Sequence, residues 1–161
     1  MLNTDPQWLA IARPLTGLHE IPGAEHSPEI LGMWRAIKRS GMQSDEVPWC
    51  AAFVGACLER AGIRSSRFES AASYLTWGIR LDGPCHGCIV VFSRNGGGLV
   101  GFVVGLDPDG RLLVLGGNQG DQVSIKAFPR DRVTGYRWPV DVAINSQPLE
   151  IARADMSRSE A

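Results

Sequence analysis

The sequence predicts one α+β domain, in which N-terminal helices pack on an antiparallel sheet of four to six strands. Its first half has helical spacing of apolar residues behind clear helix-start signals. After Gly83-Pro84 it becomes a series of short apolar runs that are typical of strands, and the turn at residues 107–110 joins two of them. Helices followed by a strand meander indicate the α+β class.

Two proline signals open the first two predicted helices. Asp5-Pro6 offers an N-cap followed by proline at the first helical position, and Pro14 should kink or end that helix. Ser27-Pro28 repeats the start signal, and Gly41 should stop the second helix after a basic last turn.

A third helix is predicted at residues 49–61, where apolar residues recur at offsets 0, 3, 4, 7, 8 and 11. These residues are Cys50, Phe53, Val54, Cys57, Leu58 and Ala61. A short fourth helix is expected at residues 70–77. Strands are then predicted at residues 89–92, 100–106, 112–115, 123–128 and 133–138. The domain should span residues 1–140, and a polar tail should occupy residues 141–161.

Composition limits the classes of function. The 161 residues carry 16 basic and 17 acidic side chains, a net charge of −1, so charge gives no case for nucleic acid or an anionic membrane as partner. The apolar runs are too short to span a bilayer, and the N-terminal residues do not resemble a secretion signal. We therefore expect synthesis in the cytoplasm without a signal peptide, and a monomer.

Cys50 is the residue most suggestive of chemistry. It falls in the first turn of the third predicted helix, where free backbone N–H groups and the positive end of the helix dipole favour a thiolate. Cys57 lies two turns further along the same apolar face and fits the core. The alternative for Cys50 is also a core cysteine. All four cysteines are expected to be free thiols.

The segment DEVPWCAAFV around Cys50, followed by Ala61-Gly62-Ile63, resembles the nucleophile helix of small papain-like cell-wall hydrolases of the NlpC and CHAP types. The resemblance continues in order through ASYLTWG, GCIVVF, GLVGFVVG and GGNQGD, and it covers about residues 8–138. It implies a papain-like fold and a cysteine amidase or endopeptidase that cuts peptidoglycan peptides, as in endolysins. Such an enzyme acts at the bacterial cell wall and needs neither metal nor cofactor.

The resemblance also implies a catalytic set, with Cys50 as nucleophile and Asn118 as the residue that orients a histidine. The histidine position is occupied by Leu99, which can neither accept the thiol proton nor protonate a leaving amine. Either an engineered substitution has silenced the enzyme, or the chain is a natural pseudoenzyme that keeps the cleft. His86 is a remote candidate for a replacement base.

Four further residues are candidates for substrate binding. They are Glu46, Trp49, Tyr74 and Gln119. The aromatic side chains could line a groove, or they could be ordinary core residues. Glu46 could meet an amide or ammonium group of the substrate, or it could be a solvated residue favoured near a helix start.

Cys85-His86-Gly87-Cys88 has CxxC spacing but leads into a strand rather than a helix. Two buried thiols are the simpler interpretation, and a redox or zinc site is the alternative. For the whole chain, the alternatives to a hydrolase are a non-catalytic wall-binding or regulatory pseudoenzyme, or a zinc or redox protein built on this cysteine pair.

Overall fold

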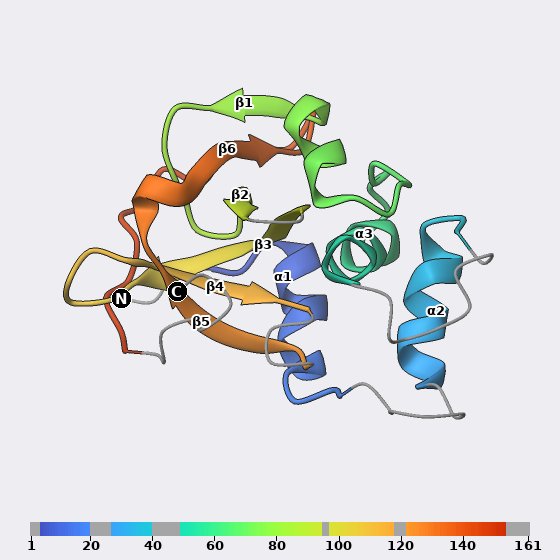
Figure 1. Cartoon of the computed structure of the whole chain (residues 1–161). Coiled ribbons are helices and arrows are strands. Elements are labelled where there is room, and N and C mark those ends of the chain that lie inside the picture. Colours follow the sequence, from blue (N-terminus) through green and yellow to red (C-terminus); the bar gives the residue numbers. More distant parts are fainter. Residues whose placement is uncertain (1–3, 20–26, 40–48, 95–96, 118–121, 154–161) are drawn as a thin grey trace.

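The computed structural model describes residues 4–19, 27–39, 49–94, 97–117 and 122–153. It has the predicted α+β class, with a six-stranded antiparallel sheet in the order β1-β6-β2-β3-β4-β5. Figure 1 shows α2 on the outside of the molecule and α3 between α2 and the sheet.

The helices and strands follow one another as the sequence predicts, helices first. The α-helices are α1 (Gln7–Ala12), α2 (Pro28–Ala36) and α3 (Cys50–Arg60), and the 3₁₀ helices are η1 (Arg13–Leu15), η2 (Ala71–Thr76) and η3 (Arg130–Arg132). The strands are β1 (Ile79–Leu81), β2 (Ile89–Arg94), β3 (Gly97–Leu106), β4 (Leu112–Gly116), β5 (Ser124–Phe128) and β6 (Val133–Trp138).

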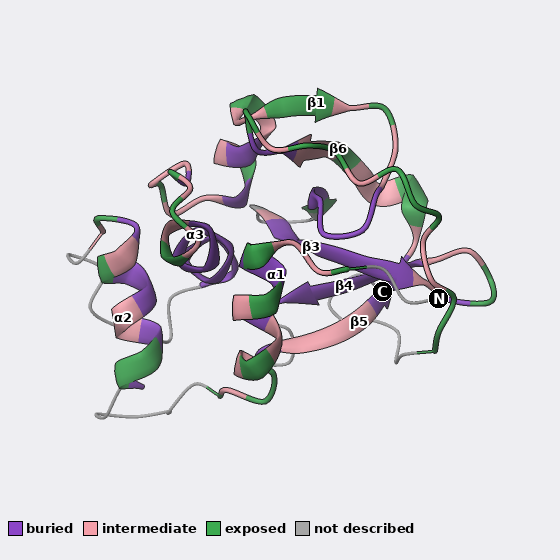
Figure 2. Cartoon of the chain, turned by 180° about the vertical axis from the view of Figure 1, so that it is seen from behind, coloured by how far each residue is buried: buried purple, intermediate pink, exposed green. Residues whose placement is uncertain are grey.

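Helix α3 is apolar on every side and is surrounded accordingly. Every residue from Cys50 to Leu58 is buried, as Figure 2 shows in purple. The helix contacts α1, α2 and β3, and the rings of Phe53 and Phe102 meet edge to face with their centroids 6.0 Å apart. A helix without a polar face needs cover all round, so α3 organises the packing of the other helices.

The sheet is strongly curled rather than flat. Phe92 of β2 stacks on Phe128 of β5 with 4.6 Å between ring centroids, although β3 and β4 lie between these strands in the sheet. Neighbouring strands are about 4.8 Å apart, so a flat sheet would hold these two strands roughly three times that distance apart. The stacked rings therefore fill the inside of the curl, and the face that meets α3 is its outer side.

Of the two helix N-caps predicted from Asp5-Pro6 and Ser27-Pro28, only the second is present. Ser27 caps α2 as predicted, since its side chain accepts a hydrogen bond from the Ile30 N–H. The helix α1 ends at Ala12, and Pro14 lies within the 3₁₀ helix η1 that follows it. The Asp5 cap is wrong: Pro6 is the N-cap of α1, and the Asp5 carboxylate binds Arg13 and His86. A carboxylate with two cationic or N–H partners elsewhere in the fold is not available for capping.

Helix α2 is also shorter than predicted. It ends at Ala36, and Lys38 adopts a φ of 66°, which is outside the right-handed helical region. The predicted stop at Gly41 lies outside the described residues. The short helix predicted at residues 70–77 is a 3₁₀ helix, η2, with Ser70 at its N-cap.

The five predicted strands are all present, and two pairings were not predicted. Strand β1 has only three residues, is largely exposed, and pairs with β6. Within the predicted tail, Ile151 forms a parallel bridge with Leu106, so residues 150–152 are attached to the end of β3. Among the described residues, no helix has the length and apolar character of a membrane span.

Glu59, in the last turn of α3, fixes the chain that follows the helix. Its carboxylate accepts hydrogen bonds from the Ser65 N–H at 3.0 Å and hydroxyl at 2.8 Å, and from Arg67 Nε at 2.9 Å. Burial alone would raise the pKa of Glu59, but these donors outweigh it and lower the pKa to about 2. Ionised Glu59 is therefore stabilised in the folded chain relative to the unfolded chain.

Replacing this carboxylate tests its contribution. Glu59→Gln should lower the free energy of unfolding by about 1–3 kcal/mol near neutral pH, because it leaves buried donors poorly paired. The folded pKa lies below the unfolded one, so the stabilisation is complete above about pH 4.5 and is lost as the pH falls towards 2. Urea unfolding at neutral pH and near pH 3 should show the wild-type advantage shrinking in acid, whereas Asp82→Asn, at an exposed carboxylate, should have little effect. An advantage that does not change between the two pH values would contradict this role.

Candidate functional site

Cys50 stands at the first residue of α3 and is 5% exposed. Trp49 is the N-cap residue, and its carbonyl accepts the first helical hydrogen bond from Phe53 N at 2.9 Å. The Trp49 side chain gives no cap, since an indole has no acceptor, and the first turn contains no acidic residue. The Cys50 sulfur thus sits where the helix dipole is positive and no helix carboxylate offsets it.

The end of β4 lies directly against this helix start. A Cβ atom on Gly117 would come within 2.7 Å of the Trp49 ring and within 2.7 Å of the Phe53 Cβ. Only glycine permits the strand to come this close to the helix. Gly117, the residue immediately after β4, therefore lies beside the first turn of α3.

Leu99 lies near the start of β3, pairs with Phe92 of β2, and is 1% exposed. The β2–β3 register is regular from residue 97 to 102, so side chains alternate between the two faces of β3. Phe102 contacts α3 on the outer side of the curled sheet. Leu99 lies three residues before Phe102 in the strand, so its side chain is on the opposite, inner face, together with that of its partner Phe92. This is the face on which Phe92 stacks against Phe128.

The strand that carries Leu99 lies beside the end of β4, and the residue after β4 lies against the helix start. Two residues along β3, a Cβ on Gly101 would lie 3.6 Å from the Cα of Gly116, and the next residue, Gly117, abuts Trp49. Three glycines thus bring the end of the sheet close to the helix start. Convergence of the Cys50, Leu99 and Asn118 side chains in one cleft stays a prediction, since Asn118 lies outside the described residues.

The four predicted substrate-binding residues divide into two groups. Trp49 and Tyr74 are fully buried, which favours the core alternative for both. Tyr74 packs edge to face on Trp77 at 5.4 Å, and burial raises the pKa of its phenol to about 12. Glu46 and Gln119 lie outside the described residues.

Two histidines have defined surroundings. His86, the candidate replacement for the missing catalytic base, is fully buried. Its Nε2 lies 2.7 Å from Asp5 Oδ1, so the imidazole is engaged with a carboxylate. His19 is exposed and forms an isolated antiparallel bridge with Gln122, just before β5. Local sequence patterns do not predict this pairing, because it joins an N-terminal loop to a segment about a hundred residues later.

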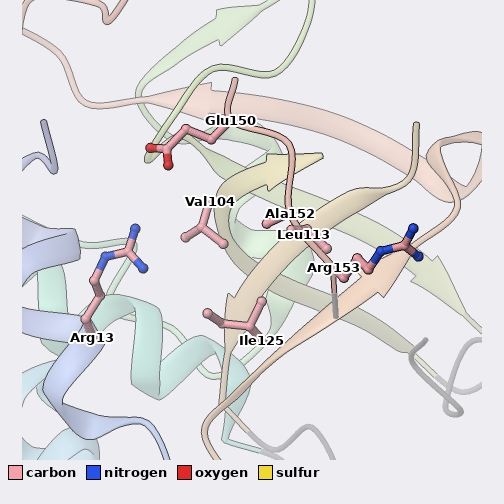
Figure 3. Close-up of a pocket in the computed structure, with 7 residues that line it drawn as sticks. All are labelled: Arg13, Val104, Leu113, Ile125, Glu150, Ala152 and Arg153. Carbon is pink, nitrogen blue, oxygen red and sulfur yellow. The ribbon is translucent and has the colours of Figure 1, made fainter. Parts of the chain in front are cut away.

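The pocket in Figure 3 is separate from Cys50 and has a volume of about 510 Å³. Val104, Leu113 and Ile125 form its apolar floor, and Arg13, Glu150 and Arg153 lie around it. Arg13 is already paired with Asp5 at 2.6 Å, and the Arg153 side chain points away from Arg13. In the part of the chain that the structure describes, no three His, Cys, Asp or Glu side chains gather as a metal site would require.

No family model and no curated protein sequence matches this chain. The functional argument therefore depends on the site itself, namely a buried cysteine at a helix start, an antiparallel sheet packed against that helix, and a leucine near the start of β3.

The contact at Gly117 can be tested by adding one methyl group. Gly117→Ala should destabilise the fold by about 1–3 kcal/mol, because the new Cβ overlaps the Trp49 ring and the Cβ of Phe53. The Phe53 Cβ is bonded to the backbone and cannot move aside by a change of rotamer. Thermal unfolding measures the effect, with Gly83→Ala as the matched control, since a Cβ at Gly83 meets nothing within 4 Å. Equal melting temperatures for the two variants would show that β4 does not press on the helix start.

Proposed function

We propose that this chain has the scaffold of a papain-like cysteine hydrolase directed at the peptide part of peptidoglycan, and that the position of its general base is occupied by Leu99. The observation that carries the proposal is the place of Cys50, at the first residue of a buried helix packed on an antiparallel sheet. Cysteine nucleophiles are commonly activated at such a helix start.

The geometry supports specific roles in amide hydrolysis. The Cys50 thiolate would attack the amide carbon, and backbone N–H groups of the first turn of α3 would stabilise the oxyanion that forms. A base at position 99 would take the thiol proton and later protonate the leaving amine, and Asn118 would orient that base. Water then hydrolyses the thioester. With leucine at position 99 the proton transfers have no carrier, so we expect little or no turnover.

A cleft that binds without cutting is the second candidate, and the burial of Leu99 favours it. Leu99 is 1% exposed and lies opposite Phe92, so the position is part of the apolar packing of β2 and β3. A chain that has adapted this position to the core fits a natural wall-binding or regulatory pseudoenzyme. A silenced enzyme would instead accept an imidazole there with little rearrangement.

Restoring the imidazole distinguishes the two candidates. Leu99→His should create or restore hydrolysis of purified peptidoglycan by about 10²–10⁴-fold over the unaltered chain, because one missing base accounts for the loss. New amine termini released from cell walls measure the reaction, and clearing of wall turbidity measures its consequence.

The double variant Leu99→His with Cys50→Ala is the control, and it should return to the level of the unaltered chain. A Leu99→His variant that folds and binds peptidoglycan, yet releases no amine from several wall types, rules out the silenced hydrolase and supports the binding candidate. A variant that folds and neither cuts nor binds contradicts both.

A further inference from the structure

The cysteines of the CxxC segment lie across one tight turn before β2. The Cys88 N–H donates to the Cys85 carbonyl at 3.1 Å, and Gly87 has a φ of +85°, which is the conformation that a type II turn needs at its third residue. The Cys85 N–H in turn donates to the Cys88 sulfur at 3.5 Å. The Cys88 side chain is thus folded back over the turn towards Cys85.

This turn is held rigidly from three directions. His86 Nε2 meets Asp5 at 2.7 Å, the Trp8 indole donates to the Gly87 carbonyl at 2.8 Å, and the Gly87 N–H donates to Val103 of β3 at 2.7 Å. Ends of a β-turn lie within 7 Å of each other, which overlaps the Cα separation that a disulfide requires. The backbone of this turn is therefore compatible with a disulfide between the two cysteines.

The two thiols are not equivalent. Cys85 is 8% exposed, whereas Cys88 is fully buried. The hydrogen bond from Cys88 lowers the pKa of Cys85, and burial raises the pKa of Cys88. Cys85 is thus the less buried and more acidic thiol, and Cys88 is the more deeply buried one. An attacking thiol of the first kind beside a resolving thiol of the second kind is the division of roles found in CxxC redox sites.

A metal site explains the segment less well. The one imidazole between the cysteines is bonded to Asp5, and among the described residues no third ligand joins the two sulfurs. Because no further ligand accompanies the two thiols in the described part of the chain, this geometry favours redox chemistry over metal binding.

We infer that Cys85 and Cys88 are a dithiol site that closes reversibly to an intramolecular disulfide, with a small disulfide such as oxidised glutathione as the oxidant. The Cys85 thiolate attacks one sulfur of the oxidant, forms a mixed disulfide and releases one reduced thiol. Cys88 then loses its proton, attacks the Cys85 sulfur and releases the second thiol. Two protons and two electrons pass to the oxidant, and an external dithiol reverses both steps.

The site would respond to the change from a reducing to an oxidising compartment. The turn anchors Asp5 and Trp8 on the N-terminal segment, and α1 in this segment packs on α3. Formation of the disulfide would hold the turn, and with it the attachment of Asp5 and Trp8, in place. The inference does not depend on Cys50 being a nucleophile, so it is independent of the proposed function.

The test begins with the unaltered chain. Folded protein is incubated with oxidised glutathione, the remaining thiols are alkylated, and the peptides are mapped by mass spectrometry without reduction. We expect one disulfide, between Cys85 and Cys88, that dithiothreitol removes, with Cys57 still a free thiol. Burial raises the pKa of Cys57 to about 12, which makes it an internal reference for an inert cysteine. A Cys85–Cys88 pair that stays reduced, or a disulfide formed by other cysteines, overturns the inference.

Two variants then test the order of attack. Cys88→Ala should trap a glutathione adduct on Cys85, and Cys85→Ala should give an adduct at position 88 at least ~10-fold more slowly. Near-ultraviolet circular dichroism checks that each variant is folded. Equal adduct formation in two folded variants overturns the assigned roles, and if a variant does not fold, the mapping of the unaltered chain still decides the inference.

Discussion

The fold depends on the need to surround α3 on every side. A helix whose residues are buried from Cys50 to Leu58 has no solvent face along that stretch, so α1, α2 and the outer side of the sheet supply cover, and Tyr74 of η2 lies against Gly55. Phe53 against Phe102 joins the helix to the middle of β3, and Gly117 lets β4 approach its first turn. The same packing brings the first turn of α3, where Cys50 stands, beside the residue that follows β4.

Curling of the sheet gives the two faces of β3 different roles. The outer side carries Phe102 and contacts the helices, and the inner side is filled by the stack of Phe92 on Phe128. Leu99 is on the inner side by alternation, near the start of the strand. A base at this position would act at the start of β3, and the proposed site requires that this strand start lie beside the start of α3.

Much of this architecture could be predicted from local patterns. Ser27-Pro28 set the start of α2, and the apolar offsets after Trp49 set α3 to within a residue at each end. Asp5 misled the prediction because its partners, Arg13 and His86, come from the tertiary fold, and the His86 contact is 81 residues away in the chain. Strand β1 was missed because its three residues, Ile79–Leu81, are too few to show a recognisable alternation, and only pairing with β6 defines them as a strand.

The candidate site was predictable only where local sequence patterns define it. A proline followed by an apolar helical run indicates where a cysteine meets a helix start, and the structure has Cys50 at that place. Burial of Trp49 and Tyr74 was not predictable, because an aromatic residue beside a helix suits a groove as well as a core. The asymmetric surroundings of Cys85 and Cys88 depend on a turn that Asp5, Trp8 and Val103 hold from outside the segment.

The central claim is that Cys50 and position 99 belong to one site. The most direct measurement is a crystal structure of the Leu99→His variant, in which the separation of an imidazole nitrogen from the Cys50 sulfur is read. Our account predicts hydrogen-bond reach, about 3–4 Å in the unliganded protein. An ordered imidazole packed on Phe92, with the Cys50 sulfur more than about 6 Å away, would contradict it.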